Sequence, residues 1–273
     1  MYNNELKNID SPEKAYLLGL FYSDGCIVNH KGSYCASIVL NEEDKYLLEK
    51  IQSLFPFFRL VKITSHAWEL ICTKKALIED LQLNGMLFRK SIDNKEFLRF
   101  PRIPIELYSH FIRGYFDGDG SVFKQKQGNI KIEIGGTCFY MITDIIRVLY
   151  DNRITVNLKC KYTGEALRKH DFYVLYTSSD KVSKQFADFI YQDCGELFLK
   201  RKYDRLYFIP EYHRKERLVC PICGGSNTVR LGSRQMLHGL MLRGSCKDCK
   251  KQFSITAPAD SNISSGGGEL LEG

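Results

Sequence analysis

The sequence predicts an α+β protein made of two tandem copies of one unit, followed by a small metal-binding module. Its 273 residues are 44% apolar, which is enough to bury a substantial core. Three observations predict this fold class. The order αββαββα occurs twice, a glycine–aspartate motif recurs 95 residues further along, and two close cysteine pairs lie near the C-terminus. The expected parts are the copies 1–100 and 101–209, a linker 210–218, the module 219–255 and a disordered tail 256–273.

The first copy opens with a helix over residues 12–23. Ser11 suits the N-cap, Pro12 suits the first helical position, and Asp24-Gly25 can end the helix. Amphipathic and apolar periodicity then predicts further elements. They are strands at 34–40, 58–64 and 67–73, with helices at 42–55 and 74–83.

The second copy follows a break in the chain at Pro101 and Pro104, and it repeats the same order. Its first helix starts at residue 105 and ends in the sequence IRGYFDGDG. The same periodicities predict the remaining elements. They are strands at 129–134, 154–162 and 171–177, with helices at 137–150 and 179–193.

Small residues form a stripe along the first helix of each copy. They recur at a spacing of four, at Ala15, Gly19 and Ser23 in one helix and at Gly114 and Gly118 in the other. This spacing places them on one face, where two helix backbones can approach closely. Since glycine inside a helix costs about 1 kcal/mol relative to alanine, the stripe predicts that the two helices pack side by side.

Each of these helices ends in an acid, at Asp24 and at Asp119. If the helices are adjacent and parallel, the two carboxylates meet at the same level. Carboxylates repel each other, and the helix dipole disfavours negative charge at a C-terminus. A divalent cation between them removes both difficulties, and oxygen ligands with open positions suit Mg²⁺. The alternative, that Asp-Gly merely forms a turn, is weakened because the motif occurs twice in register.

The motifs LLGLFYSDG and IRGYFDGDG resemble those of the LAGLIDADG homing endonucleases of the single-chain, two-motif type, over about residues 12–209. The resemblance implies a pseudo-twofold core with saddle-shaped antiparallel sheets. It also implies a monomer that makes a double-strand break in a long DNA target by metal-dependent phosphodiester hydrolysis. The last acid of each motif would bind the metal, which assigns Asp24 and Asp119, with Gly25 and Gly120 beside them. Mn²⁺ or Ca²⁺ could replace Mg²⁺. Asp117 falls at an earlier, non-catalytic motif position.

The same resemblance places a basic residue late in each copy, near the active centre. Lys90 and Lys202 occupy matching places, and an ammonium group there can stabilise charge on the scissile phosphate. The strands would lie along the DNA major groove, with basic side chains near the phosphates. The candidate DNA contacts in the core are Lys31, Arg59, Lys62, Lys124, Lys126, Lys131, Lys159, Lys161 and Arg168. Each of these residues could instead be an ordinary solvated charge.

Four cysteines form two C-x-x-C pairs, Cys220 with Cys223 and Cys246 with Cys249, separated by 22 residues. Four thiolates leave no open position on a tetrahedral ion, so the spacing predicts a structural Zn²⁺ site. The surrounding sequence resembles the zinc ribbons of DNA-binding proteins. Its basic residues include the further candidate DNA contacts Arg230, Arg234, Arg243 and Lys247. A protein contact is the alternative role for this module.

The net charge of +7 is unevenly spread, since residues 196–253 hold 13 Lys and Arg against 5 Asp and Glu. A basic segment of this kind favours a polyanion partner, most often a nucleic acid. No apolar run is long enough to span a bilayer, and no signal peptide is evident, so no membrane partner is expected. The other cysteines are scattered. We therefore expect an intracellular, reducing compartment, such as the cytoplasm, the nucleoid or an organelle matrix.

Three alternatives share the predicted fold. The protein could be an RNA maturase that binds intron RNA, and such a protein can retain both acids. It could be a non-cleaving DNA-binding regulator, for which loss of one acid would be typical. It could also be embedded in an intein, which the Met-Tyr start and the absence of a final His-Asn argue against.

Overall fold

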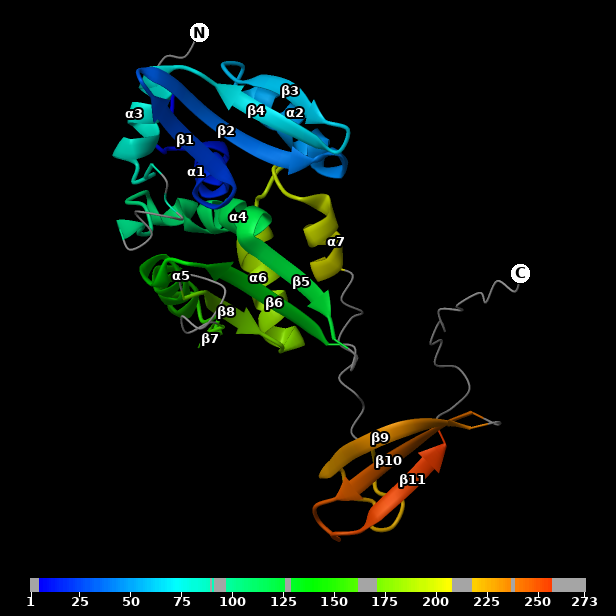
Figure 1. Ribbon diagram of the computed structural model, residues 1–273. Coiled ribbons are helices and arrows are strands. Elements are labelled where there is room, and N and C mark those ends of the chain that lie inside the picture. The colour runs from blue at the N-terminus through cyan, green and yellow to red at the C-terminus, as the bar shows by residue number, and fades with distance from the viewer. Residues whose placement is uncertain are drawn as a thin grey trace, which may run out of the picture. The chain divides into compact units, whose positions relative to one another are not determined.

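The computed structural model describes residues 5–88, 90, 97–125, 129–161, 171–207, 218–236 and 239–256. The chain divides into two units, Met1–Pro210 and Glu211–Gly273 (Figure 1). The predicted linker 210–218 and tail 256–273 fall almost wholly outside the described residues, although Thr256 ends a strand. In the described part of the chain, no helix has both the length and the hydropathy needed to cross a membrane.

The first half of the larger unit has the order αββαββα, with a short 3-10 turn before its second helix. Its strands form an antiparallel sheet of order β1-β2-β4-β3. The elements are α1 (Pro12–Ser23), β1 (Gly25–His30), β2 (Ser33–Asn41), η1 (Glu42–Asp44), α2 (Lys45–Leu54), β3 (Arg59–Thr64), β4 (Ala67–Cys72) and α3 (Lys75–Leu83).

The second half repeats this order and adds one helix at its end. Its antiparallel sheet has the equivalent order β5-β6-β8-β7. The elements are η3 (Ile105–Leu107), α4 (Tyr108–Asp119), β5 (Gly120–Lys124), β6 (Ile130–Gly136), α5 (Phe139–Asp151), β7 (Asn157–Cys160), β8 (Tyr173–Thr177), α6 (Asp180–Tyr191) and α7 (Lys200–Tyr207). The predicted α+β fold with two repeated units is therefore confirmed.

The structure adds three elements that the sequence did not locate. Strands β1 and β5 begin at the glycine that closes each motif, and they are short, with exposed residues at their ends away from the motif. Helix α7 has the sequence KRKYDRLY, in which five of the eight residues are charged, so in the sequence it resembles a charged linker. It is helical because Leu206 and the stem of Lys202 are buried against the core.

Helices α1 and α4 lie side by side at the centre of the larger unit, between the two sheets (Figure 1). A Cβ added to Gly19 would stand 2.0 Å from the carbonyl oxygen of Phe111. A Cβ added to Gly114 would stand 2.1 Å from the carbonyl oxygen of Tyr16. No side chain fits at either place, so the predicted packing of the two small-residue stripes is confirmed. We call this contact the seam.

Each sheet of the larger unit has one face packed on helices and one face left open by them. In the second sheet, Ile130, Ile132 and Ile134 point into the core, while Lys131 and Glu133 alternate with them on the other face. Helices α5 and α6 pack against the core face, and α2 and α3 pack against the first sheet in the same way. Two open sheet faces therefore flank the ends of the seam helices.

The smaller unit is a three-stranded antiparallel sheet of order β11-β10-β9. Its strands are β9 (Thr228–Met236), β10 (Gly239–Cys246) and β11 (Gln252–Thr256). Its buried cluster is small and contains Cys220, Cys246 and Phe253. A sheet with so little apolar core needs a further source of stability, such as a metal ion.

Candidate active site and cysteine cluster

The two motif acids come together at the ends of the seam helices. Asp24 is the C-cap of α1, where its N–H donates to the carbonyl oxygen of Leu20 at 3.0 Å, and Asp119 is the last residue of α4. A Cβ added to Gly118 would lie 3.1 Å from the carboxyl carbon of Asp24, so the Asp24 side chain reaches the second motif. The packing of α1 against α4 therefore brings the carboxylates of Asp24 and Asp119, one from each half, together at the C-terminal ends of the two helices.

Both carboxylates reach solvent, but the protein around them displaces enough water to change their ionisation. Burial and then the negative charge of Asp24 raise the pKa of Asp119 to about 6, while Lys90 and Lys202 lower it in part. Burial also raises the pKa of Asp24, and the charges of Lys202, Lys90 and Arg201 oppose this effect. Two neighbouring carboxylates whose charged forms are disfavoured by burial are a suitable donor set for a cation.

Lys202 lies against the C-terminal end of α4. Its Nζ donates to the carbonyl oxygens of Phe116 at 2.7 Å, Asp117 at 2.6 Å and Gly118 at 3.3 Å. These carbonyls belong to the last turn of α4, where only that of Phe116 also accepts from the C-cap N–H of Gly120, and a cation at a helix C-terminus compensates the helix dipole. Burial lowers the pKa of Lys202 to about 8, although the charge of Asp117 raises it in part.

Lys90 lies beside the other motif, where its Nζ donates to the carbonyl oxygen of Gly25 at 2.5 Å. It lines a cavity of 680 Å³ together with Asp24, and it also lines a neighbouring cavity of 250 Å³ together with Tyr115 and Asp119. Burial lowers the pKa of Lys90, and the charges of Asp119 and Asp24 oppose this. Both predicted lysines therefore lie with the two acids, one beside each motif.

Asp117, the earlier acid of the second motif, is directed into the protein. It is 1% exposed, and its Oδ2 accepts from the Tyr16 hydroxyl at 2.7 Å and from the Leu199 N–H at 2.9 Å. The equivalent first-half residue, Tyr22, donates instead to the carbonyl oxygen of Asn84 at 2.7 Å. The two halves therefore differ at this motif position.

Three of the predicted DNA contacts gather on the open face of the second sheet. Lys131 and Lys159 bond to Glu133 Oε1 at 2.7 and 2.8 Å, and Lys161 bonds to Glu133 Oε2 at 3.0 Å. Burial alone would raise the pKa of Glu133, but the three hydrogen bonds lower it to about 2. We call these four residues the lysine cluster; it carries two positive charges in excess. Lys159 also lies 4.5 Å from the ring of Tyr176.

The other predicted DNA contacts are more scattered. Lys31 lies in the turn between β1 and β2, Arg59 and Lys124 are exposed on β3 and β5, and Lys62 pairs with Glu42 at 3.3 Å. Lys126 and Arg168 lie outside the described residues. Arg243 and Lys247 are exposed in the smaller unit. Arg230 and Arg234 belong to β9, but their side chains are outside the described part of the structure.

Two residues of the site, Tyr115 and Arg201, carried no sequence signal for their contacts. Tyr115 hydrogen-bonds the carboxylate of Asp119, but it resembles an ordinary core aromatic of the helix. Arg201 pairs with Asp44 at 3.0 Å across the two halves, but in the sequence it is one of a run of charges. The Arg201–Asp44 pairing joins residues 157 positions apart, so it depends on the fold and cannot be identified from a local pattern.

The four cysteines of the smaller unit meet in one cluster. Their sulfur atoms all lie within 4.8 Å of one another, with Cys220 and Cys249 at 3.7 Å and Cys223 and Cys246 at 3.6 Å. A tetrahedral Zn²⁺ with Zn–S bonds of about 2.3 Å has S···S edges of about 3.8 Å. The predicted four-cysteine cluster is confirmed, and its size fits zinc.

Comparisons with solved structures find the meganuclease I-AabMI bound to uncleaved DNA, with a TM-score of 0.48 and 14% identity over 73% of this chain and 89% of that chain. They also find I-SmaMI bound to uncleaveable DNA, with a TM-score of 0.48 and 11% identity over 72% and 88% of the two chains. A third is I-DmoI in complex with DNA and Ca, with a TM-score of 0.45 and 17% identity over 69% and 92%. No curated protein matches the chain.

A family model gives the assignment. The model described as "LAGLIDADG-like domain" matches residues 11–77 and 106–190, which is more than half of the chain. Its two matched segments cover both motif helices, both acids and most of the two sheets. The chain therefore belongs to the LAGLIDADG homing endonuclease family.

Proposed function

We propose that the protein is a site-specific endonuclease that makes a double-strand break in a long DNA target by divalent-metal-dependent hydrolysis of phosphodiesters. The observation that carries this proposal is the meeting of Asp24 and Asp119 at the ends of the seam helices, with one buried lysine beside each motif. Family membership supports the reaction class. The catalytic acids of this proposal are Asp24 and Asp119.

The donor set at the seam fits a hard divalent cation such as Mg²⁺, or Mn²⁺ or Ca²⁺ in its place. The two carboxylates supply oxygen ligands, and a bound cation would offset the burial and the Asp24 charge that raise the pKa of Asp119. The carbonyls of Gly25 and Gly120 are the nearby candidates for further ligands, although that of Gly25 already accepts from Lys90. When bound, the metal would polarise the phosphate and activate water for attack.

The chain's own residues would position the phosphate and balance its charge. Lys90 and Lys202 place one ammonium group beside each motif, where negative charge on the scissile phosphate develops. Both groups are desolvated, which strengthens their electrostatic effect relative to a surface lysine. Tyr115 holds the carboxylate of Asp119 from the side, which limits its rotation.

The open sheet faces are the proposed DNA surface, with the lysine cluster near the phosphates. The basic smaller unit would extend the footprint on the DNA, and its cysteine cluster would hold a structural Zn²⁺.

Because one chain contains both acids, we propose that it acts as a monomer. Thiols that must stay reduced to bind zinc also favour an intracellular, reducing compartment.

The test is selection of cleavage sites from a randomised duplex DNA library in Mg²⁺, repeated with Asp24→Asn and Asp119→Asn. We expect the wild type to cut both strands of a long site and each variant to lose double-strand cleavage. Cutting at the wild-type rate by both variants would refute the assignment of the acids. Intron RNA bound tightly, with no DNA cut in any library, would instead favour the maturase alternative. Sequence-specific DNA binding without cutting would favour the regulator.

A further inference from the structure

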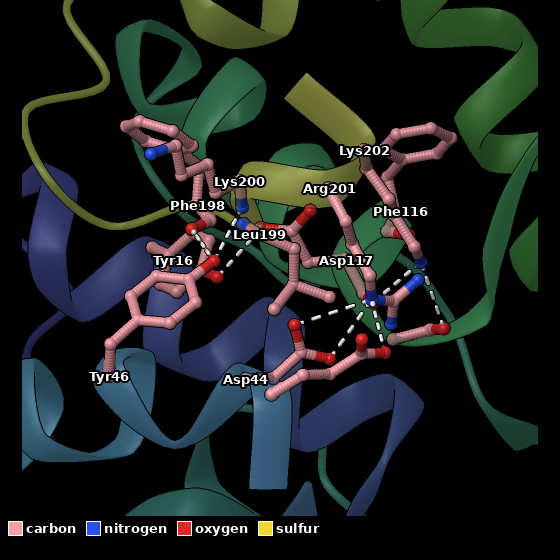
Figure 2. A network of polar contacts seen from close by, with 12 residues as sticks. Tyr16, Asp44, Tyr46, Phe116, Asp117, Phe198, Leu199, Lys200, Arg201 and Lys202 are labelled. Atoms are coloured by element: carbon pink, nitrogen blue, oxygen red, sulfur yellow. Dashed lines mark hydrogen bonds and ion pairs between the residues drawn. The ribbon is translucent and has the colours of Figure 1, made fainter. Parts of the chain in front are cut away.

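Residues 197–202, which we call the strap, carry Lys202 to the end of α4 and are bonded along their whole length (Figure 2). The bonds come from both halves of the protein. We propose that Asp117 in the second half, and Asp44 and Tyr46 in the first, are positioning residues that hold the strap and so place Lys202 at the active site. This inference rests on the proposed function only in assuming that Lys202 acts on the DNA phosphate.

The second half holds the start and the middle of the strap through α4. Arg113 Nε donates to the carbonyl oxygen of Leu197 at 2.8 Å, and the Leu199 N–H donates to Asp117 Oδ2 at 2.9 Å. Asp117 is itself held by the hydroxyl of Tyr16, from the opposite seam helix, at 2.7 Å. These groups are buried, so water cannot easily replace the bonds.

The first half holds the strap from the other side. The Tyr46 hydroxyl donates to the carbonyl oxygen of Phe198 at 3.2 Å and accepts from the Lys200 N–H at 2.5 Å. Arg201 Nε donates to Asp44 Oδ2 at 3.0 Å and Oδ1 at 3.3 Å. Asp44 is 2% exposed, and a buried carboxylate of this kind requires its cationic partner. Figure 2 shows Tyr46 and Asp44 reaching the strap from the first half.

These hydrogen bonds to the strap matter because Lys202 has a long, flexible side chain. Its ammonium group can have a defined position only if its backbone is held in place. The strap fixes its backbone on both sides, and three carbonyls of α4 then fix its ammonium group. Displacing a catalytic group by about 1 Å can cost about a hundredfold in rate. A residue encoded in the second half is therefore positioned in part by side chains of the first half.

The first test uses Tyr46→Phe and Asp44→Asn, which keep shape while removing hydrogen bonds or charge. Tyr150→Phe is the matched control, because Tyr150 is 69% exposed on α5. We expect single-turnover cleavage of the selected target to slow about tenfold in the two strap variants, with target Kd in Ca²⁺ changed less than twofold. Because Lys202 lies beside one motif and Lys90 beside the other, nicked DNA should accumulate. Tyr150→Phe should behave as wild type.

The second readout needs no cleavage: acetylation of the Lys202 amine by acetic anhydride, followed by mass spectrometry. The strap variants should acetylate Lys202 several-fold faster than wild type, with the reactivity of exposed Lys184 unchanged. Asp117→Asn adds a third variant, with the same direction expected. Unchanged Lys202 reactivity would overturn the positioning role, even if the wild type cuts no DNA. Faster acetylation with unchanged cleavage, or equal losses in rate and affinity, would overturn the catalytic consequence.

Discussion

At the scale of single residues, the close packing of α1 against α4 explains why each helix contains glycine, at Gly19 and Gly114. Glycine disfavours a helix more than any residue except proline. The backbone of one helix occupies the space that a side chain of the other would need. The cost of glycine, about 1 kcal/mol relative to alanine, is offset by close backbone contact along the whole seam. The stripe was readable in the sequence because spacing of four is a local pattern.

Gly19→Ala should therefore destabilise the protein. The added methyl group would lie 2.0 Å from the Phe111 carbonyl oxygen and would push the helices apart, which outweighs the gain in helix propensity. We expect a loss of about 2 kcal/mol in the free energy of unfolding, measured by urea titration. Gly32→Ala is the control: its φ of +85° is strained for alanine, but nothing lies within 4 Å. That variant should lose about 1 kcal/mol. Equal losses would contradict the steric account.

His110 should make stability depend on pH. Burial and then the charge of Arg113 lower the pKa of His110 to about 4, from 6.5 for a free histidine. Its neutral Nδ1 accepts from Arg113 Nη1 at 2.8 Å. The unfolded chain binds the proton more tightly, so this contribution is present above about pH 6.5 and is lost as the pH falls towards 4, by up to about 3 kcal/mol.

The measurement for His110 is urea unfolding between pH 7.5 and 4.5, compared with His110→Gln. Glutamine can still accept from Arg113 but does not titrate. We expect the variant to lose less stability than wild type over this range, by about 2 kcal/mol. Parallel curves for the two proteins would show that His110 does not carry the effect.

At the scale of elements, the sequence predicted most helices of the larger unit and six of its eight described strands, because each has a clear period. It did not locate β1 and β5, which are short and directly follow a helix, or α7, whose charged residues surround a buried leucine and the buried lysine stem. The lysine cluster was foreseen as separate basic residues. Their shared carboxylate, Glu133, was missed because it comes from β6 and two of the lysines from β7 and its end.

The open face of the second sheet yields a prediction on DNA binding. Replacing both Lys159 and Lys161 by methionine should weaken target binding and lower the slope of log K against log salt by about 1 to 2. The matched control replaces Lys181 and Lys184, two exposed lysines of α6, the helix that packs on the other side of this sheet. That control should leave the slope unchanged. Equal effects in both pairs would indicate a general charge effect with no role for this face.

At the scale of the whole molecule, the two units have separate hydrophobic clusters and should unfold separately. Removing metal with a strong chelator and then restoring Mg²⁺ should abolish the unfolding transition of the smaller unit and leave that of the larger unit in place. Calorimetry with zinc analysis measures this, and Cys246→Ser should behave like the chelated protein. Full zinc content in that variant would contradict the four-cysteine site.

The seam also has a consequence for how the two halves can diverge. Its closest contacts, at Gly19 and Gly114, are made to backbone atoms of the opposite helix, so these two positions require glycine whatever the neighbouring side chains are. These backbone contacts do not require the neighbouring side chains of the two halves to be alike. The two halves do differ at one motif position. Tyr22 of the first half donates to the backbone carbonyl of Asn84, whereas Asp117 of the second half accepts from the strap. A contact that depends on backbone atoms at a few positions allows the two halves of one chain to carry different side chains at equivalent motif positions.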